Sequence, residues 1–267
     1  MPKSHQRDPF SPRTACNRSS AVMNAAVLVD ETRDKSTGLH ETIVWAQDNG
    51  FTTAHRTEQE VLLTRDHTTI KWERHTEFIN ITVVAPRTAE AQIRTWLNGI
   101  LTAQRDAGSL ISQSRFDIRP LGADAHDFAA EALSDELLDY ASPSAQVKIW
   151  VNNQAHMIQT ALQHDADHFV RYRLDVINTQ PDRIGRLVQR LIEIETYRSL
   201  AYLSVPLVRD LGQDIARIDG EIDQIAQESQ QEASAADEAR ILQSLTRLSA
   251  QIQGLGSTAE FRFSAST

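Results

Sequence analysis

The hydrophobic residues of this chain follow the two-residue period of β-strands in several segments before residue 180, and they follow a helical period from residue 183 onward. The clearest alternation lies at residues 147–151, 155–162 and 170–176. Asn152 and Asn153, between the first two of these segments, favour the positive φ of a tight hairpin turn. The pattern therefore predicts a three-stranded meander.

Shorter strand and helix patterns precede the meander. Residues 21–29 form a short apolar strand, and residues 70–84 alternate at both ends, which predicts two strands or one bent strand that Pro86 closes. Residues 38–47 and 93–101 have helical spacing. Two further segments are a predicted strand at residues 110–118 and a segment with a helical bias at residues 128–138.

Residues 183–209 predict a helix whose hydrophobic stripe contains charged residues in its middle. At about 100° per residue, one face of this helix carries Ile184, Val188, Leu191, Glu195, Arg198 and Tyr202. Glu195 and Arg198 are close enough to pair, and burying either one alone costs several kcal/mol. We expect a buried ion pair that locks the helix on the sheet. The alternative is a carboxylate that serves a functional pocket.

After Pro206, which should kink or restart the helix, the apolar residues fall into two heptad seams. The first seam comprises Leu211, Ile215, Ile218, Ile222 and Ile225. The second seam, after the polar segment ESQQEASAADE, comprises Leu242, Leu245, Leu248 or Ser249, Ile252 and Leu255. Both are too short to identify a free coiled coil, so we expect an antiparallel helical hairpin that packs on itself or on a partner. Gly254 and Gly256 are expected to end its second helix.

Together these elements predict an α+β fold, with an antiparallel or mixed sheet and packed helices followed by an antiparallel heptad helical hairpin. The region before residue 20 lacks periodicity and is expected to be an irregular tail. We expect four parts, which are the N-terminal tail at residues 1–20, an α+β domain at 21–205 that includes the helix at 183–205, the hairpin at 206–256 and a truncated C-terminal tail at 257–267.

Composition narrows the classes of function. The chain has 267 residues, 40% of them hydrophobic, which is enough for a packed core. Its net charge of -9 disfavours nucleic acid and anionic lipid surfaces as partners. Cys16 is the only cysteine, which excludes an intramolecular disulfide and a multi-cysteine zinc site. Because the sequence has neither a membrane-spanning apolar run nor a signal-peptide core, we expect the chain as given in the cytoplasm.

The segment ERHTEF supplies most of a candidate polar site, which comprises Glu73, His75, Glu77, Glu195 and Arg198. On a strand, Glu73, His75 and Glu77 point to the same face, where a histidine flanked by carboxylates can bind a divalent metal or act as a general base. The same residues also suit a solvated face or a polar partner for Arg198. Because one strand supplies only part of a site, we predict neither a metal nor a cofactor.

A second polar segment, HDADH, lies at residues 164–168. The four-residue spacing of His164 and His168 suits a metal on a helix, but the segment is expected to bend between two strands as a charged loop. The sequence has no GxGxxG or P-loop motif and no GxSxG elbow, and Cys16 has no identifiable catalytic partner. Nucleotide hydrolysis and triad catalysis therefore have no support.

Four segments carry a resemblance to a known family, and they are WERHTEF at residues 72–78, RLVQRLIEIETYR at 186–198, LSVPLVRDL at 203–211 and FRFSA at 261–265. Over most of its length the chain resembles a bacterial family of uncharacterised membrane-anchored proteins that carry a domain of unknown function. The resemblance implies a membrane anchor beyond the FRFSA segment, which this chain lacks, and a location at the cytoplasmic face of the bacterial inner membrane. It implies no activity. The family's opening His-x-Arg-Pro-Phe element is interrupted here by Asp8.

The two heptad seams and the lack of a reaction motif predict a non-catalytic scaffold or adaptor that acts through protein–protein contacts. The hairpin is expected to serve self-association or partner binding, and only the implied anchor would contact the membrane. The alternative is a ligand sensor or enzyme with a site built from His75, Glu77, Glu195 and Arg198. A solvent-open pocket around those four side chains would favour the alternative, and a closed, mutually satisfied network would favour the scaffold.

Overall fold

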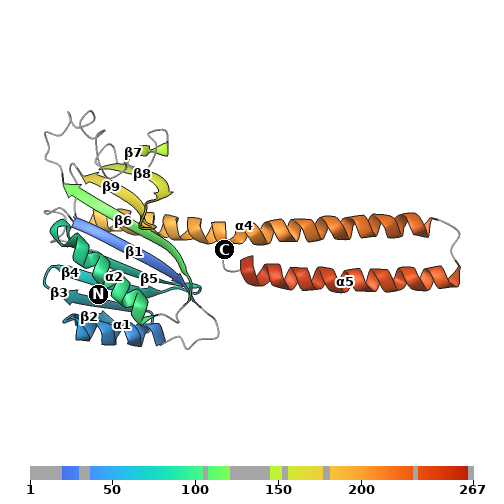
Figure 1. The fold of residues 1–267 in the computed structure, drawn as a ribbon, viewed down its shortest axis with the longest axis horizontal. Helices are drawn as coiled ribbons and strands as arrows, with labels where there is room; N and C mark the ends of the chain where they lie inside the picture. Colours follow the sequence, from blue (N-terminus) through green and yellow to red (C-terminus); the bar gives the residue numbers. More distant parts are fainter. Residues whose placement is uncertain are drawn as a thin grey trace, which may run out of the picture. The chain divides into compact units, whose positions relative to one another are not determined.

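The computed structural model describes residues 20–29, 37–104, 108–120, 145–151, 156–176, 181–230 and 234–263. Over these residues the chain forms one nine-stranded mixed sheet and four α-helices, of which the last two are long (Figure 1). The predicted α+β class with a C-terminal helical region is confirmed. The segment predicted at residues 128–138 and the turn predicted at Asn152 and Asn153 lie outside the described residues.

The strands lie in the order β2-β3-β4-β5-β1-β6-β9-β8-β7. Neighbouring strands are antiparallel except β6 and β9, which run parallel. The strands are β1 (Ser20–Leu28), β2 (Thr52–Arg56), β3 (Glu60–Arg65), β4 (Thr68–Arg74), β5 (Phe78–Pro86), β6 (Leu110–Pro120), β7 (Val147–Val151), β8 (His156–His164) and β9 (Val170–Val176). The last three form the predicted meander, and β4 and β5 are the two strands predicted within residues 70–84.

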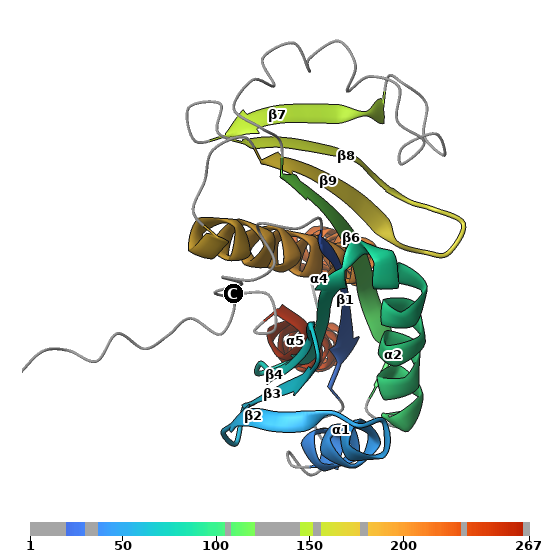
Figure 2. The same ribbon diagram turned by 90° about the vertical axis from the view of Figure 1, so that its left-hand side faces the viewer.

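Helices cover both faces of the sheet. They are α1 (Thr37–Asp48), the short 3-10 helix η1 (Arg87–Ala89), α2 (Glu90–Ala103), α4 (Pro181–Ser229) and α5 (Ala235–Phe263). On one face, α1 and α2 pack on a cluster that includes Trp72 and Ile81. On the other face, Ile184 and Val188 from the start of α4 pack on a cluster that includes Phe116. Figure 2 shows α2 and the start of α4 on opposite sides of β1 and β6.

The chain divides into two compact units, residues 1–196 and 197–267, and α4 runs through the division. We refer to them as the sheet unit and the hairpin unit. The sheet unit contains all nine described strands together with α1, α2 and the first sixteen residues of α4. The hairpin unit contains the rest of α4 and α5, which are the two helices of the predicted hairpin.

Two helix boundaries differ from the prediction. α4 continues through Pro206 instead of restarting there, and α5 continues through Gly254 and Gly256 to Phe263. Pro206 is exposed, so water can bond the carbonyl group that the proline leaves unpaired one turn earlier. A glycine costs only about 1 kcal/mol relative to alanine inside a helix, and the good helix formers around it offset that cost. The tail predicted to begin at residue 257 is therefore helical up to Phe263.

Candidate functional site

The segment ERHTEF does not lie on one strand. β4 ends at Arg74, and residues 75–77 form the turn that leads into β5. The amide of His75 donates to the carbonyl oxygen of Phe78 at 2.8 Å, which reverses the chain direction. The carbonyl oxygen of Glu77 accepts from the amide of Val29, just after the neighbouring strand β1, at 2.7 Å. The prediction that Glu73, His75 and Glu77 share one strand face is therefore wrong, because the turn changes the direction of the backbone between them.

His75 lies in a half-buried position beside charged groups. Its ring stacks on Phe78 with centroids 4.4 Å apart, and its Nε2 atom is buried with no hydrogen-bond partner in the described structure. Burial lowers the pKa of His75 below 6.5, while the carboxylates of Glu73 and Glu193 oppose this shift and Lys71 adds to it. The imidazole is therefore neutral at pH 7 and has one nitrogen atom available to a ligand or a water molecule.

Glu73 is engaged in an ion pair that the sequence analysis did not identify. The ammonium group of Lys71 lies 2.5 Å from a carboxylate oxygen of Glu73 and 3.7 Å from one of Glu60. The side chain of Lys71 is only 6% exposed, so the two carboxylates offset the cost of burying its charge. Lys71 holds Glu73 in a structural ion pair, which disfavours Glu73 as a ligand for a metal.

Glu195 is buried, as the helical periodicity predicted. It is 1% exposed, and its Oε2 atom accepts a hydrogen bond of 2.8 Å from the hydroxyl group of Tyr172 on β9. The Tyr172 ring stacks on Phe116 of β6 with centroids 4.9 Å apart. The structure therefore fixes α4 to the parallel pair of strands through a charged hydrogen bond. Tyr172 lies in the strand predicted at residues 170–176, but it was not predicted as a partner of Glu195.

Arg198 belongs to the hairpin unit. Its guanidinium group is half-buried and lies over the ring of Tyr202, 5.6 Å from the centroid. This geometry is that of a cation–π contact between successive turns of one helix. The pairing of Arg198 with Glu195 stays a prediction.

The HDADH segment forms the turn between β8 and β9, as expected. Asp165 accepts hydrogen bonds of 2.9 Å from the amides of Asp167 and Phe169, and it also pairs with Arg171. Burial by itself would raise the pKa of Asp165, but the Phe169 amide and Arg171 outweigh it and lower the pKa. Asp167 pairs with Arg94 at 2.7 Å. These carboxylates stabilise the turn, and among the described residues no group of three or more His, Cys, Asp or Glu side chains is placed to hold a metal ion.

A further polar cluster, which the sequence analysis missed, lies on the sheet face opposite α4. The carboxylate of Asp175 on β9 accepts from Arg173 at 2.9 Å and from Gln159 at 3.3 Å, and all three side chains are buried. Burial raises the pKa of Asp175, and Arg173 partly offsets that effect. Two-residue alternation places Arg173 and Asp175 on one face, but periodicity alone does not show that this face is covered. The cluster is internally hydrogen-bonded, which is typical of a structural role.

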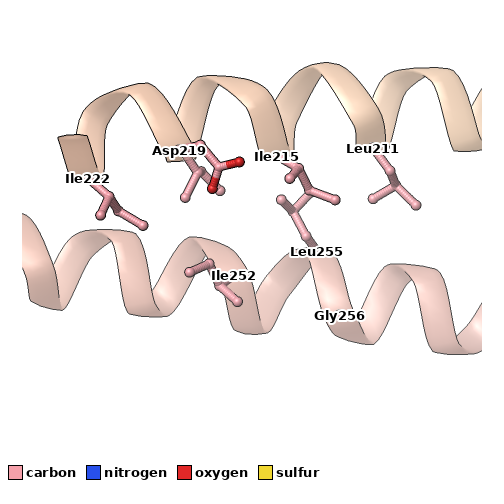
Figure 3. A pocket seen from close by; sticks show the side chains of 8 residues that line it. Leu211, Ile215, Asp219, Ile222, Ile252, Leu255 and Gly256 are labelled. Atoms are coloured by element: carbon pink, nitrogen blue, oxygen red, sulfur yellow. The ribbon is translucent and has the colours of Figure 1, made fainter. Parts of the chain in front are cut away.

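The hairpin unit contains an apolar pocket between α4 and α5, with a volume of about 370 Å³. Its lining consists of Leu211, Ile215, Ile218, Asp219, Ile222, Ile252, Leu255 and Gly256. Figure 3 shows Leu211, Ile215 and Ile222 of α4 on the side that faces Ile252 and Leu255 of α5. The pocket is an open groove that runs along the two helices, and Asp219 is the one charged residue in its lining.

The hairpin buries little of its apolar surface. Among the side chains that the structure describes in this unit, Leu200, Ile218 and Leu248 are the buried hydrophobic ones. Other heptad residues are exposed, with exposed fractions of 54% for Ile215 and 49% for Ile252. No helix in the described part of the chain combines the length and the hydropathy needed to cross a membrane. The exposed apolar residues therefore form a stripe along an otherwise polar hairpin, which is the pattern of a contact surface.

Comparison with known proteins places the chain in a family. The family model described as "Protein of unknown function (DUF3422)" matches residues 7–267. None of the curated proteins matches the chain. An NMR structure of PA4090 from Pseudomonas aeruginosa is similar to the chain at 12% identity over 35% of this chain and 93% of that protein, but its TM-score of 0.26 is too low to support an argument. The chain therefore belongs to the DUF3422 family of proteins of unknown function.

Proposed function

We propose that this protein is a non-catalytic scaffold or adaptor that acts through protein–protein contacts made by its helical hairpin. The observation that carries the proposal is the exposure of apolar heptad residues along α4 and α5. Burying the exposed half of one such side chain is worth about 1 kcal/mol. Several residues of this kind on one surface supply enough free energy for a specific contact, and a solvent-exposed hairpin without a partner gains nothing from them.

The proposal includes a location at the cytoplasmic face of a bacterial inner membrane, through an anchor outside this chain. Its support is the resemblance of four sequence segments to a membrane-anchored family. Fractionation of cells that express the native gene product tests this part of the proposal. Recovery in the inner-membrane fraction is expected, and recovery entirely in the soluble fraction would contradict it.

A substitution in the hairpin tests the proposed function directly. The variant Ile222→Glu with Leu245→Glu places two charges among the exposed apolar residues, and Gln224→Glu with Gln243→Glu adds the same charge elsewhere on the same helices. Native gel electrophoresis of cell lysates should show the wild type and the Gln224/Gln243 variant in an assembly larger than the single chain. The Ile222/Leu245 variant should lose that assembly. If all three migrate identically, the hairpin is not the contact surface.

The second candidate function is a ligand sensor or enzyme with a polar site around His75, Glu77, Glu195 and Arg198. The observation that favours it is the buried, unpartnered Nε2 atom of His75. Native mass spectrometry of the purified chain distinguishes the two candidates. A metal or metabolite adduct that disappears in His75→Ala but persists in His67→Ala would favour the sensor or enzyme. A spectrum without adducts would favour the scaffold.

A further inference from the structure

The two helices of the hairpin contact each other along a defined set of positions. Beyond Pro206, the partly or fully buried side chains described on α4 are Leu211, Asp214, Ile218, Glu221, Ile225 and Glu228. On α5 they are Asp237, Ile241, Ser244, Leu248, Gln251 and Leu255. These positions recur in steps of three and four residues, which is the spacing of a coiled-coil seam. We call these twelve positions the hairpin seam, and six of them are polar.

The apolar stripe of each helix is not centred on this seam. Ile215 and Ile222 each lie one residue after a seam position, which rotates them by about 100° away from it. The same offset applies to Leu245 and Ile252 on α5. The two helices are antiparallel, so the same one-residue offset turns opposite ways when both are viewed from one end. The offset residues of α4 and those of α5 therefore lie on the same side of the hairpin. That side is the groove shown in Figure 3.

The two sides of the hairpin therefore differ in chemistry. One side, the apolar flank, comprises Val208, Ile215, Ile222, Leu242, Leu245 and Ile252, all of which are exposed. The other side, the polar flank, lies one residue before the seam and comprises Arg217, Gln224, Gln227, Arg240, Gln243 and Arg247. The polar flank carries ion pairs, such as Arg247 with Glu221 at 2.6 Å. The side chains of the polar flank interact favourably with water, whereas those of the apolar flank expose hydrophobic surface to it.

This arrangement is that of one half of a four-helix bundle. In such a bundle each helix contacts one neighbour within the hairpin and another across the bundle, so its apolar stripe points between the two. In this hairpin, Leu211 and Ile218 lie at the inner edge of the stripe, and Ile215 and Ile222 lie at the outer edge. The remaining positions of this flank include Gly212 and others with small side chains, which permit another helix to approach closely.

We propose that the apolar flank binds the apolar flank of a second copy of this chain, so that two hairpins form a four-helix bundle about a two-fold axis. The inference rests on the proposed function and names the partner of the same surface. A two-fold contact requires a self-complementary surface, and an apolar flank with small residues between large ones meets that requirement. Asp219 lines the groove between Ile215 and Ile222 and is exposed in the single chain.

The size of the flank fits a reversible dimer. From Val208 to Ile222 the flank is about 21 Å long, and two helices side by side are about 20 Å wide. Two such faces together bury on the order of 1,000 Å², near the lower limit for a specific interface. We therefore expect a concentration-dependent dimer.

Charge argues against a membrane surface as the occupant of the flank. Between residues 208 and 229, α4 carries six acidic residues and two arginines. This excess of negative charge repels the anionic headgroups of a bacterial membrane. On the flank itself a second copy meets a smaller barrier, because Asp219 is the one charged residue that lines the groove.

Sedimentation velocity of the full chain, from sub-micromolar to high micromolar concentration, tests the inference. The wild type and the polar-flank variant, Gln224→Glu with Gln243→Glu, should both convert from monomer to dimer. The apolar-flank variant, Ile222→Glu with Leu245→Glu, should dimerise roughly 100-fold more weakly, because the dimer would bury unpaired charges. A wild type that stays monomeric at every concentration, or an apolar-flank variant that dimerises normally, would overturn the inference.

A second measurement keeps the test valid if the apolar-flank variant misfolds. A photo-reactive benzophenone amino acid is incorporated at position 222 or 224 of an otherwise unmodified chain. This chain is then mixed with an equal amount of ¹⁵N-labelled wild type. Irradiation should produce mixed-isotope crosslinks between hairpins from position 222 on the apolar flank and far fewer from position 224 on the polar flank. Crosslinks that are only intramolecular would overturn the inference.

The two experiments separate this inference from the proposed function. If the chain is monomeric in vitro but the apolar-flank variant still loses its assembly in cells, a different protein occupies the flank and the scaffold function stands. If the assembly in cells is also unaffected by the variant, the scaffold function fails together with the dimer.

Discussion

In the sheet unit, hydrophobic side chains pack into buried clusters on both faces of the sheet, whereas in the hairpin unit most of the large hydrophobic side chains that the structure describes are exposed. Trp72 and Ile81 are 0% exposed in the sheet unit, and Ile215 and Leu242 are 54% and 66% exposed in the hairpin. The sheet unit therefore completes its own core. The hairpin has the sequence pattern of a core, but within the described part of this unit its apolar stripe is left exposed.

The two units also differ in whether their charged side chains are buried or exposed. In the sheet unit, charged side chains such as Lys71, Glu195 and Asp175 are buried and paired. In the hairpin, ion pairs such as Arg247 with Glu221 lie at the surface, where such pairs contribute little stability. Buried pairs fix the position of one element on another, so the sheet unit is a specific tertiary structure. The surface pairs of the hairpin keep its polar flank in water.

The largest expected effect is that of truncating a buried isoleucine of the sheet unit, and the same truncation in the hairpin provides the comparison. Ile81→Ala should lower the free energy of unfolding by about 3 to 4 kcal/mol, because the residue is fully buried and a cavity remains. Ile222→Ala should cost less than about 1 kcal/mol in dilute solution, where its side chain is 40% exposed. Urea unfolding at low and high protein concentration measures both. The cost of Ile222→Ala should grow with concentration and that of Ile81→Ala should not.

The next effect is that of removing the buried carboxylate of the sheet unit. Glu195→Ala should destabilise the protein by about 2 to 4 kcal/mol, because it leaves a cavity and removes the acceptor of the Tyr172 hydrogen bond. Glu238→Ala, at an exposed position of α5, should cost less than about 0.5 kcal/mol and serves as the control. Thermal melts provide the comparison. An unchanged melting temperature for Glu195→Ala would show that this residue has no structural role.

A smaller effect is expected from replacing Tyr172, which donates the hydrogen bond to Glu195. Tyr172→Phe keeps the ring that stacks on Phe116 and removes only the hydroxyl group. Its cost should be about 1.5 to 3 kcal/mol, which is the range for hydrogen bonds to charged groups. The double variant with Glu195→Gln should cost less than the sum of the two single variants. Additive costs would show that the two side chains do not interact.

The smallest expected effect is a dependence of stability on pH that comes from His156 in the sheet unit. Burial, together with Arg183, lowers the pKa of His156 below 6.5, so the unfolded state binds more protons than the folded state in mildly acidic solution. Stability is therefore present above pH 6.5 and is lost as the pH falls from there through the folded-state pKa. Melting temperatures of wild type and His156→Gln across this range measure the effect. Equal slopes for the two proteins would contradict it.

Sequence periodicity predicted the elements that have one covered face. The meander, β4, β5 and the hairpin all carry alternating or heptad apolar residues, and they were found from that pattern. β2 and β3 were not predicted. All residues of β2 are exposed, so its sequence TTAHR has no alternation to detect, and β3 contains the consecutive apolar residues Val61, Leu62 and Leu63, which obscure the period.

The candidate site was predicted less well, because its residues depend on tertiary contacts. The turn at residues 75–77 contains no glycine, proline or asparagine, so no turn residue marked where the strand before His75 ends. The burial of Glu195 followed from helical periodicity, but its partner Tyr172 is 23 residues away. In the hairpin the heptad stripe was found, and its offset from the contact seam was not, because the offset depends on how the two helices face each other.

Hydrogen exchange followed by mass spectrometry, at a low and a high concentration of the full chain, tests most directly whether the two units differ in self-sufficiency. Amides of β1 and β5 should exchange slowly and equally at both concentrations, because the sheet unit completes its own core. Amides of the hairpin around Ile222 and Leu245 should exchange faster at low concentration and slow down at high concentration. Hairpin exchange that is slow and independent of concentration would contradict the account.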